Sequence, residues 1–241
     1  MISDTADSNL DKIRLNPYPG RGIIIGQTPD GSRMMQIYWL TGRSENSRNR
    51  IFVQESEGIR TQAFDPAKLS DPSLIIYWPA RRFGSTFLVT NGDQTDTLFH
   101  MMQQGATFED ALMTREFEPD PPNFTPRISG MADISDVEGG YRLSILKAQD
   151  GSPERCVRCF YRFGKATPGI GHCIHTYQGD GNPLPVFSGD PYVVPVPNTV
   201  DEAVARYWPL LDGNNRVALF ARTVERGSGA VETRIINRHQ A

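Results

Sequence analysis

The chain has 241 residues, of which 38% are hydrophobic and 22% are charged, as is typical of a globular protein with a sizeable core. The net charge of −3 and the isoelectric point near 5.8 argue against a general attraction to nucleic acid or anionic membranes. The sequence lacks a long apolar run, a secretion signal and an even set of cysteines. We therefore expect a cytoplasmic protein that binds neither nucleic acid nor a membrane.

Taken in chain order, most predicted elements are strands. Short runs rich in β-branched and aromatic residues, bounded by Gly, Pro, Asp or Ser, are typical of strands. Such runs lie at 22–26, 34–41, 73–78, 85–91, 141–148, 156–163, 172–178, 216–223 and 231–238. Apolar and polar residues alternate most clearly in 141–148 and 231–238, which predicts half-buried strands there.

Three helices are predicted from their capping signals. The first follows Asp93, which stands in the N-cap position. The second begins at Thr107, with Asp110 at the capping-box position, and the third begins at Thr199, with Glu202 in the same role.

The element order is strands, two helices, more strands, one helix and two strands. This order indicates an α+β fold rather than a strict alternation of strand and helix. No repeat or linker marks a second domain, so we expect a single domain over residues 17–241, preceded by an N-terminal extension over residues 1–16.

Cys156, Cys159, His172 and His175 are spaced almost as in a two-Cys, two-His zinc finger. In a finger, however, a helix carries both histidines, and no helical pattern carries these two. Residues three apart in a strand point to opposite faces, which separates the members of each pair. We favour a hairpin with its turn at 164–171, with one histidine facing the core and the other facing a surface or cleft.

Three polar segments could bind a ligand. "TGRSENSRNRIF" (41–52) carries three arginines among other donors and could clamp a phosphate, or it is a solvated turn. "TNGDQTDT" (90–97) leads into a helix N-terminus, which suits an anion, or it is a plain capping turn. "REFEPDPPNFTPRI" (115–128) is a long acidic loop, either functional or merely exposed.

Together these segments carry a resemblance to a known family. "YPGRG", "GRSENSR", "DPSLIIY", "TNGDQTD" and "NFTPRI", in this order, resemble the archaeal-type inosine monophosphate (IMP) cyclohydrolases and their bacterial relatives. "GHCIHTYQGDGNPLP" and "ETRIINRHQ" resemble the bacterial branch in particular. The resemblance extends from about Tyr18 to the C-terminus.

The resemblance implies a four-layer αββα sandwich like that of the N-terminal-nucleophile hydrolases, without their nucleophile. It implies the last step of purine synthesis, in which 5-formamido-imidazole-4-carboxamide ribotide closes to IMP with loss of water. It further implies that no metal or other cofactor takes part, that the ligand is a purine nucleotide, and that the protein is a homo-oligomer.

The resemblance also assigns site residues by position. In the catalytic set, Tyr77 donates to the formyl oxygen or relays a proton, Glu118 is the general base, and Arg127 orients it or the oxyanion. Arg48 belongs both to this set and to a clamp for phosphate.

The substrate-binding set has seven further members. Arg21, Arg43 and Ser44 complete the phosphate clamp, and Asn91 and Asp96 orient the base and carboxamide. His172 and His175 are expected in the cleft.

Two other functions remain open from the sequence. One is a nucleotide-binding or regulatory module that retains the clamp but not the reaction. The other is an amidohydrolase, or a cyclohydrolase that acts on a different nucleotide.

Overall fold

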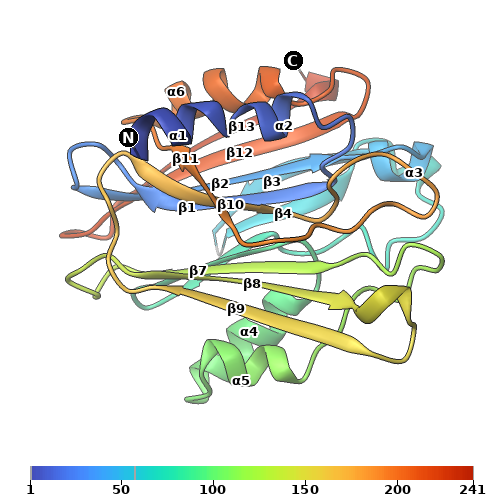
Figure 1. The fold of residues 1–241 in the computed structure, drawn as a ribbon, viewed down its shortest axis with the longest axis horizontal. Helices are drawn as coiled ribbons and strands as arrows, with labels where there is room; N and C mark the ends of the chain where they lie inside the picture. Colours follow the sequence, from blue (N-terminus) through green and yellow to red (C-terminus); the bar gives the residue numbers. More distant parts are fainter. Residues whose placement is uncertain (1, 57, 241) are drawn as a thin grey trace.

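The structure is a computed structural model that describes residues 2–56 and 58–240. Its strands form two antiparallel sheets that face each other, and helices lie on the outer side of each sheet (Figure 1). The prediction of an α+β fold is confirmed. Among the described helices, none is both long and apolar enough to cross a membrane.

The first sheet has six strands in the spatial order β11-β10-β1-β2-β12-β13. Their bounds are β1 (Arg21–Gln27), β2 (Arg33–Thr41), β10 (Ile170–His175), β11 (Tyr192–Pro195), β12 (Arg216–Glu225) and β13 (Val231–Asn237). The central strands β1 and β2 pair along their length, from Arg21 opposite Leu40 to Gln27 opposite Met34. Both faces of this pair are buried, so its sequence is a continuous apolar run without alternation.

The second sheet has seven strands, β3 to β9, whose spatial order follows the sequence. Their bounds are β3 (Arg50–Glu55), β4 (Gly58–Ala63), β5 (Ala80–Phe83), β6 (Thr86–Thr90), β7 (Arg127–Asp133), β8 (Tyr141–Ala148) and β9 (Cys156–Phe163). Each strand therefore pairs with its neighbours in the chain, and the sheet is a meander.

Helices α1 (Ile2–Ser8), α2 (Asp11–Arg14) and α6 (Val200–Tyr207) cover the outer face of the six-stranded sheet (Figure 1). Helices α4 (Gln94–Gln103) and α5 (Phe108–Met113) cover the seven-stranded sheet. A one-turn helix, α3 (Glu45–Arg48), follows β2. Short 3₁₀ turns lie at Pro66–Lys68, Gln149–Gly151, Trp208–Leu210 and Arg238–Gln240.

The three predicted helices are present as α4, α5 and α6, and the capping boxes begun by Thr107 and Thr199 both form. The prediction for Asp93 is only half right. Asp93 stands at the N-cap of α4 but makes no capping hydrogen bond. Its carboxylate instead pairs with Arg127 and Arg115, at 2.6 and 2.5 Å.

Two predictions about strands are wrong. The run 73–78 is a set of turns, in which Ile75 N–H and Ile76 N–H both donate to the carbonyl of Pro72. The hairpin predicted around 164–171 does not exist, because β9 belongs to the seven-stranded sheet and β10 to the other. The two cysteines and the two histidines of the finger-like spacing therefore lie in different sheets.

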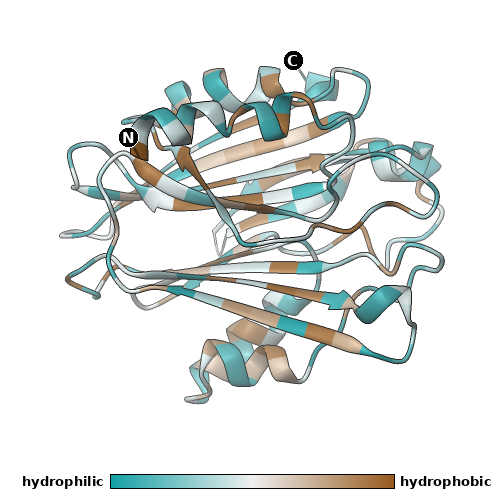
Figure 2. Cartoon of the chain, viewed as in Figure 1, coloured by the Kyte–Doolittle hydropathy of each residue, from teal (hydrophilic) through white to brown (hydrophobic). Residues whose placement is uncertain are grey.

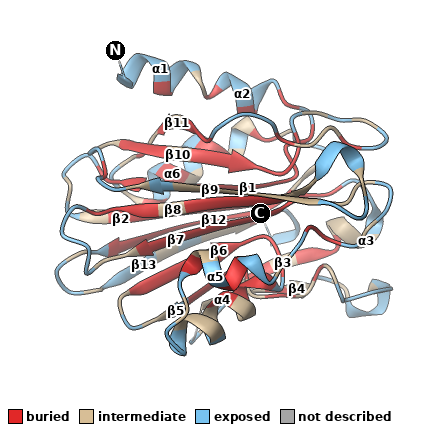
Figure 3. Ribbon diagram, turned by 60° about the horizontal axis from the view of Figure 1, so that its bottom comes forward, coloured by how far each residue is buried: buried red, intermediate tan, exposed pale blue. Residues whose placement is uncertain are grey.

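The main core fills the space between the sheets. The rings of Tyr38, Phe52 and Phe220 meet there, with centroids 5.3–5.7 Å apart. Figure 2 shows hydrophobic residues concentrated along the strands of the six-stranded sheet, and Figure 3 shows that these strands are largely buried.

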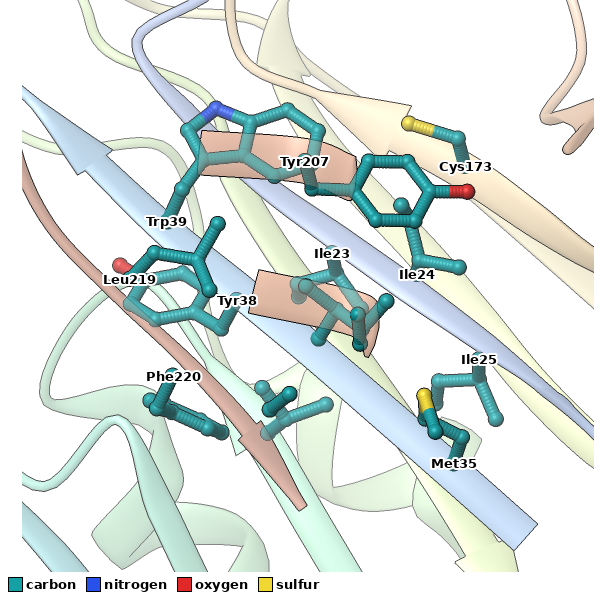
Figure 4. Packing of buried hydrophobic residues seen from close by; sticks show 14 of the residues in the cluster. Ile23, Ile24, Ile25, Met35, Tyr38, Trp39, Cys173, Tyr207, Leu219 and Phe220 are labelled. Atoms are coloured by element: carbon teal, nitrogen blue, oxygen red, sulfur yellow. The ribbon is translucent and has the colours of Figure 1, made fainter. Parts of the chain in front are cut away.

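The opposite face of the six-stranded sheet packs against α6, where Trp39 lies beside Tyr207 (Figure 4). Gly22 makes room for this indole, since a Cβ at that position would lie 1.9 Å from the ring of Trp39.

Candidate active site

A cavity of about 350 Å³ opens at one end of the two sheets, near the starts of β1 and β3 and just before β7. Segments far apart in the sequence line it: 18–21, 43–50, 71–75, 118–125 and 177–184. The lining includes four of the residues predicted from the sequence, namely Arg21, Arg43, Ser44 and Glu118.

Arg21 and Glu118 form a buried ion pair in the wall of this cavity. Arg21 Nη2 lies 2.8 Å from Glu118 Oε2, and the glutamate side chain is 2% exposed. Burial is the largest effect on Arg21 and opposes its charge, but the Glu118 carboxylate acts together with the hydroxyls of Tyr177, Tyr77 and Tyr38 and holds the pKa of Arg21 well above its ordinary value. For Glu118 burial prevails and raises the pKa, although the charges of Arg21 and Arg127 oppose it.

The second carboxylate oxygen of Glu118 is free. Oε1 is buried and has no hydrogen-bond partner among the residues that the structure describes. Carboxylates with a raised pKa and an open coordination position recur at sites of proton transfer. These features are the ones on which an acid–base role for Glu118 would depend.

Arg50, at the start of β3, also lines the cavity and is 2% exposed. Its Nε donates to the carbonyl of Ser47 at 2.8 Å, and among the described residues it has no carboxylate within ion-pair distance. Burial lowers the pKa of Arg50, and the nearby charge of Arg21 also lowers it. A buried guanidinium without an acidic partner favours the binding of an anion.

Tyr77 lies next to this basic wall but does not line the cavity. Its hydroxyl is 2.7 Å from that of Tyr38. Burial raises the pKa of Tyr77, while the charges of Arg50 and Arg21 act in the opposite direction. The two phenols therefore lie within electrostatic reach of the arginines.

The loop that carries Glu118 is closed by its own hydrogen bonds. Glu118 N–H donates to the carbonyl of Thr125 at 2.8 Å. Asp120 accepts from the backbone N–H and the hydroxyl of Thr125, at 2.6 and 2.5 Å. The Thr125 hydroxyl also lies 2.5 Å from the hydroxyl of Tyr177, which ties the loop to the segment after β10.

Arg127 lies behind Glu118, at the start of β7. It is buried, donates to Gln94 Oε1 at 2.8 Å and pairs with Asp93 at 2.6 Å. Gly92 lies close to both charged groups, because a Cβ there would be 2.6 Å from Arg127 Nη1 and 3.3 Å from Glu118 Oε1. The Asn-Gly turn therefore permits the approach of Arg127 to Glu118.

Arg43 closes the cavity on its open side. Its Nη1 pairs with Asp180 at 2.6 Å and donates to the carbonyl of Gly181 at 2.9 Å. Its guanidinium also lies 5.1 Å from the ring centroid of Tyr18. Next to it, Ser44 caps α3 through a reciprocal pair of hydrogen bonds with Ser47.

Like Tyr77 and Arg127, three further residues predicted for the site lie outside the cavity lining. Arg48 donates to the carbonyl of Gly42 at 2.9 Å and to Asn215 at 3.1 Å. Asn91 is fully buried, donates to the carbonyl of Pro126 just before β7 and accepts from the N–H of Ile128 within β7. Asp96, on α4, forms an ion pair with Arg81 of β5 at 2.9 Å.

The two histidines lie apart from Glu118 as well. His172 stacks on Phe163 and is hydrogen-bonded through Nδ1 to the hydroxyl of Tyr141 at 2.6 Å. His175 Nδ1 donates to the carbonyl of Tyr177 at 2.8 Å, and its ring lines a separate cavity beside α2. Burial lowers the pKa of each histidine to about 4.

Four residues of the site were not selected from the sequence: Arg50, Asp120, Thr125 and Tyr177. All four lie within segments that stood out in the sequence, but nothing in those segments ranks one polar residue above the next. Burial is the signal that separates them, and it depends on the tertiary fold.

Arginines, one buried carboxylate and several hydroxyl groups thus surround a cavity of small-molecule size. The basic residues suit a phosphate group, since the arginine fork matches phosphate oxygens. The free carboxylate oxygen suits the movement of a proton on the same ligand.

Two similarities to known proteins bear on this cavity. The family described as "IMP cyclohydrolase-like protein" matches residues 18–228, a range that contains the cavity lining. The chain is also 31% identical to the IMP cyclohydrolase of Methanopyrus kandleri over 146 residues, which are 56% of this chain and 71% of that protein. The resemblance noted in the sequence is confirmed, and the chain belongs to the IMP cyclohydrolase-like protein family.

Proposed function

We propose that this protein is an IMP cyclohydrolase, which closes 5-formamido-imidazole-4-carboxamide ribotide to IMP with loss of water. The observation that carries the proposal is Glu118, a buried carboxylate with one free oxygen in the wall of an arginine-lined cavity. Membership of the family supports the same reaction.

In this reaction the carboxamide nitrogen bonds to the formyl carbon and gives up a proton. The formyl oxygen takes up a proton and becomes a hydroxyl group. The formamide nitrogen then loses its own proton and forms a double bond to the same carbon, while the hydroxyl takes up a second proton and leaves as water. Both reacting groups belong to one molecule, so no covalent enzyme intermediate is needed. Holding them in contact accounts for much of the rate enhancement.

We assign the proton transfer to Glu118. Its free Oε1 accepts the proton of the carboxamide nitrogen and returns a proton to the departing hydroxyl. Arg21 holds the other oxygen at 2.8 Å and so fixes the direction of Oε1. Arg127 adds positive charge beside Glu118, which favours the developing oxyanion.

Tyr77 is proposed to act on the formyl oxygen through a proton relay that includes Tyr38, because its own side chain does not line the cavity. Support comes from the 2.7 Å contact between the two hydroxyls and from the nearby charges of Arg50 and Arg21. Burial raises the pKa of both phenols, so each remains a hydrogen-bond donor at neutral pH.

The phosphate of the nucleotide is assigned to Arg43, Arg50 and Ser44. Arg50 is buried and lacks a carboxylate among the described residues, so a phosphate would supply the missing negative charge. Arg43 would exchange Asp180 for the phosphate, which is a modest cost because that pair is partly exposed.

We also propose that the fold is a four-layer αββα sandwich related to the N-terminal-nucleophile hydrolases, and that the protein forms a homo-oligomer. The first is supported by the facing sheets with helices outside them (Figure 1). A crystal structure tests the first, and analytical ultracentrifugation tests the second.

The test of the proposed function is a mixture of the purified, chelator-treated protein with the formamido-carboxamide ribotide, followed by absorbance. Formation of IMP would support the reaction and its independence from metal. Binding of the nucleotide without product would instead indicate a nucleotide-binding module. Release of formate or ammonia would indicate hydrolysis.

A further inference from the structure

A second cavity of about 350 Å³ lies at the other end of the sheets, near the ends of β3 and β12. Strands of both sheets line it, and two of its lining residues are arginines, Arg82 and Arg222. Neither arginine has a role in the cyclohydrolase site.

Arg222 is buried, with 3% of its surface exposed. Its Nε donates to Gln36 Oε1 at 2.7 Å and its Nη2 to the carbonyl of Leu88 at 2.8 Å. Both acceptors are neutral, and Nη1 makes no hydrogen bond to any residue that the structure describes. Among the described residues, the hydrogen bonds of Arg222 therefore go to neutral acceptors.

Strand register explains why the two guanidinium groups face the same space. Arg222 is opposite Gln36 on one side and Thr233 on the other, and directly opposed residues project from the same face of a sheet. In the facing sheet Arg82 is opposite Phe87, and the Arg222 guanidinium lies 5.3 Å from the Phe87 ring centroid.

The local electrostatics favour an anion. Burial lowers the pKa of Arg222 to about 9, and the positive charge of Arg82 lowers it in the same direction. Glu55 also lines the cavity but accepts from Gln62 at 3.3 Å, and it forms no ion pair with either arginine. Arg222 is a buried charge without a carboxylate partner among the described residues, which favours a negatively charged ligand beside it, and Arg82 adds an exposed positive charge at the mouth of the same cavity.

We propose that this second cavity binds a small oxyanion, the carboxylate or phosphate group of a metabolite, between Arg82 and Arg222. Arginine forks match the oxygens of both groups, and the Thr233 side chain supplies a hydroxyl donor at the same wall. The volume restricts the ligand to a small molecule. The cavity lies at the opposite end of the strands from Glu118, so this site is independent of the proposed cyclohydrolase reaction.

The test follows the unfolding temperature as chloride is replaced by inorganic phosphate, or by succinate, at constant ionic strength. A ligand that binds only the folded state raises this temperature by an amount that grows with the logarithm of one plus the ratio of its concentration to its dissociation constant. Arg82→Gln removes one arginine of the site. The matched control is Arg162→Gln, an exposed arginine on β9 of the same sheet that lies outside this cavity.

We expect Arg82→Gln to raise the half-saturating anion concentration about tenfold or more, the effect of losing one charge-assisted hydrogen bond. Arg162→Gln should respond as the unaltered protein does. Phosphate that binds beside Glu118 contributes equally to both variants, so their difference reports the second cavity alone. Whether phosphate or succinate binds more tightly identifies the preferred group.

Arg222→Met gives a second measurement. It should abolish the response that Arg82→Gln weakens, because the guanidinium that would hold the anion is gone. Equal responses of Arg82→Gln and Arg162→Gln would overturn the proposal, as would the absence of any response to both anions. Should Arg222→Met fail to fold, the comparison of the other two variants decides.

Discussion

One carboxylate oxygen of Glu118 accepts from Arg21 at 2.8 Å, and the other is buried without a hydrogen-bond partner among the residues that the structure describes. The ion pair anchors the glutamate in the wall of the cavity and leaves the hydrogen-bonding capacity of the other oxygen unused by the described residues. The proposed reaction requires one oxygen to be held by Arg21 and the other to exchange a proton with the substrate.

The reaction should require Glu118 in its charged form. Because burial raises the pKa of this group above its ordinary value of about 4.5, kcat/KM should fall as the pH is lowered through an apparent pKa above that value. A pH profile measures this limb. Arg21→Met removes a positive charge and should move the limb to higher pH, whereas an unmoved limb would assign it to another group.

Gly92→Ala should damage the site without touching a charged residue. The added Cβ would lie 2.6 Å from Arg127 Nη1 and 3.3 Å from Glu118 Oε1, so one of these groups must shift. We expect kcat/KM to fall about 10- to 100-fold, as for other small displacements of catalytic groups. The control is Gly213→Ala, where an added Cβ has nothing within 4 Å. Equal activities of the two variants would contradict this geometry.

Arg43 and Arg48 should behave differently although they are five residues apart. Arg43 lines the cavity, so Arg43→Gln should raise KM about tenfold through the loss of one charge-assisted hydrogen bond. Arg48 donates hydrogen bonds to the carbonyl of Gly42 and to the side chain of Asn215. Arg48→Gln removes these bonds and should therefore lower the unfolding temperature, but it should leave KM unchanged. Steady-state kinetics and a thermal melt separate the two effects, and a raised KM for Arg48→Gln would argue for a direct contact with substrate.

His175 should make the fold sensitive to acid. Burial lowers its pKa to about 4, so the folded protein keeps it neutral while the unfolded chain takes up a proton below about pH 6.5. Stability is therefore lost as the pH falls from 6.5 towards 4, by at most about 3 kcal/mol for this residue. Urea unfolding should show a smaller loss for His175→Gln than for the control His100→Gln, which alters an exposed residue of α4. A loss of the same size in both would contradict the assignment.

The strands that could be predicted are those with long apolar or clearly alternating runs, such as β1, β2, β8 and β12. The short or polar strands were missed: β3, β4, β5, β7 and β11. Pairing with neighbours on both sides holds most of these in place, and local propensity does not report such pairing.

The error at 73–78 has a local cause. The Thr61 hydroxyl accepts from the N–H of Tyr77 and donates to the carbonyl of Ile75. The side chain of Thr61 therefore makes hydrogen bonds that a neighbouring strand would otherwise make with this backbone. Pro72 and Pro79 at the flanks also limit pairing. The apolar side chains of Ile75 and Tyr77 are buried all the same, which produced the strand-like pattern.

For the site, the sequence could select segments but could not choose among their residues. Arg43 faces the cavity and Arg48 faces Asn215 because the one-turn helix α3 turns the chain between them. Asn91 lies in a motif of the family, yet its amide is consumed by backbone hydrogen bonds. Such distinctions require the tertiary structure.

Glu118→Gln tests the central claim most directly, since the amide keeps the shape of the side chain but cannot accept the proton. The measurement pairs turnover of the formamido-carboxamide ribotide with the dissociation constant of IMP. We predict that kcat falls by about 10²–10⁴-fold while IMP still binds. Tyr77→Phe should lower kcat by a smaller factor. Turnover of the Gln variant at the rate of the unaltered protein would contradict the assignment of Glu118 as the base.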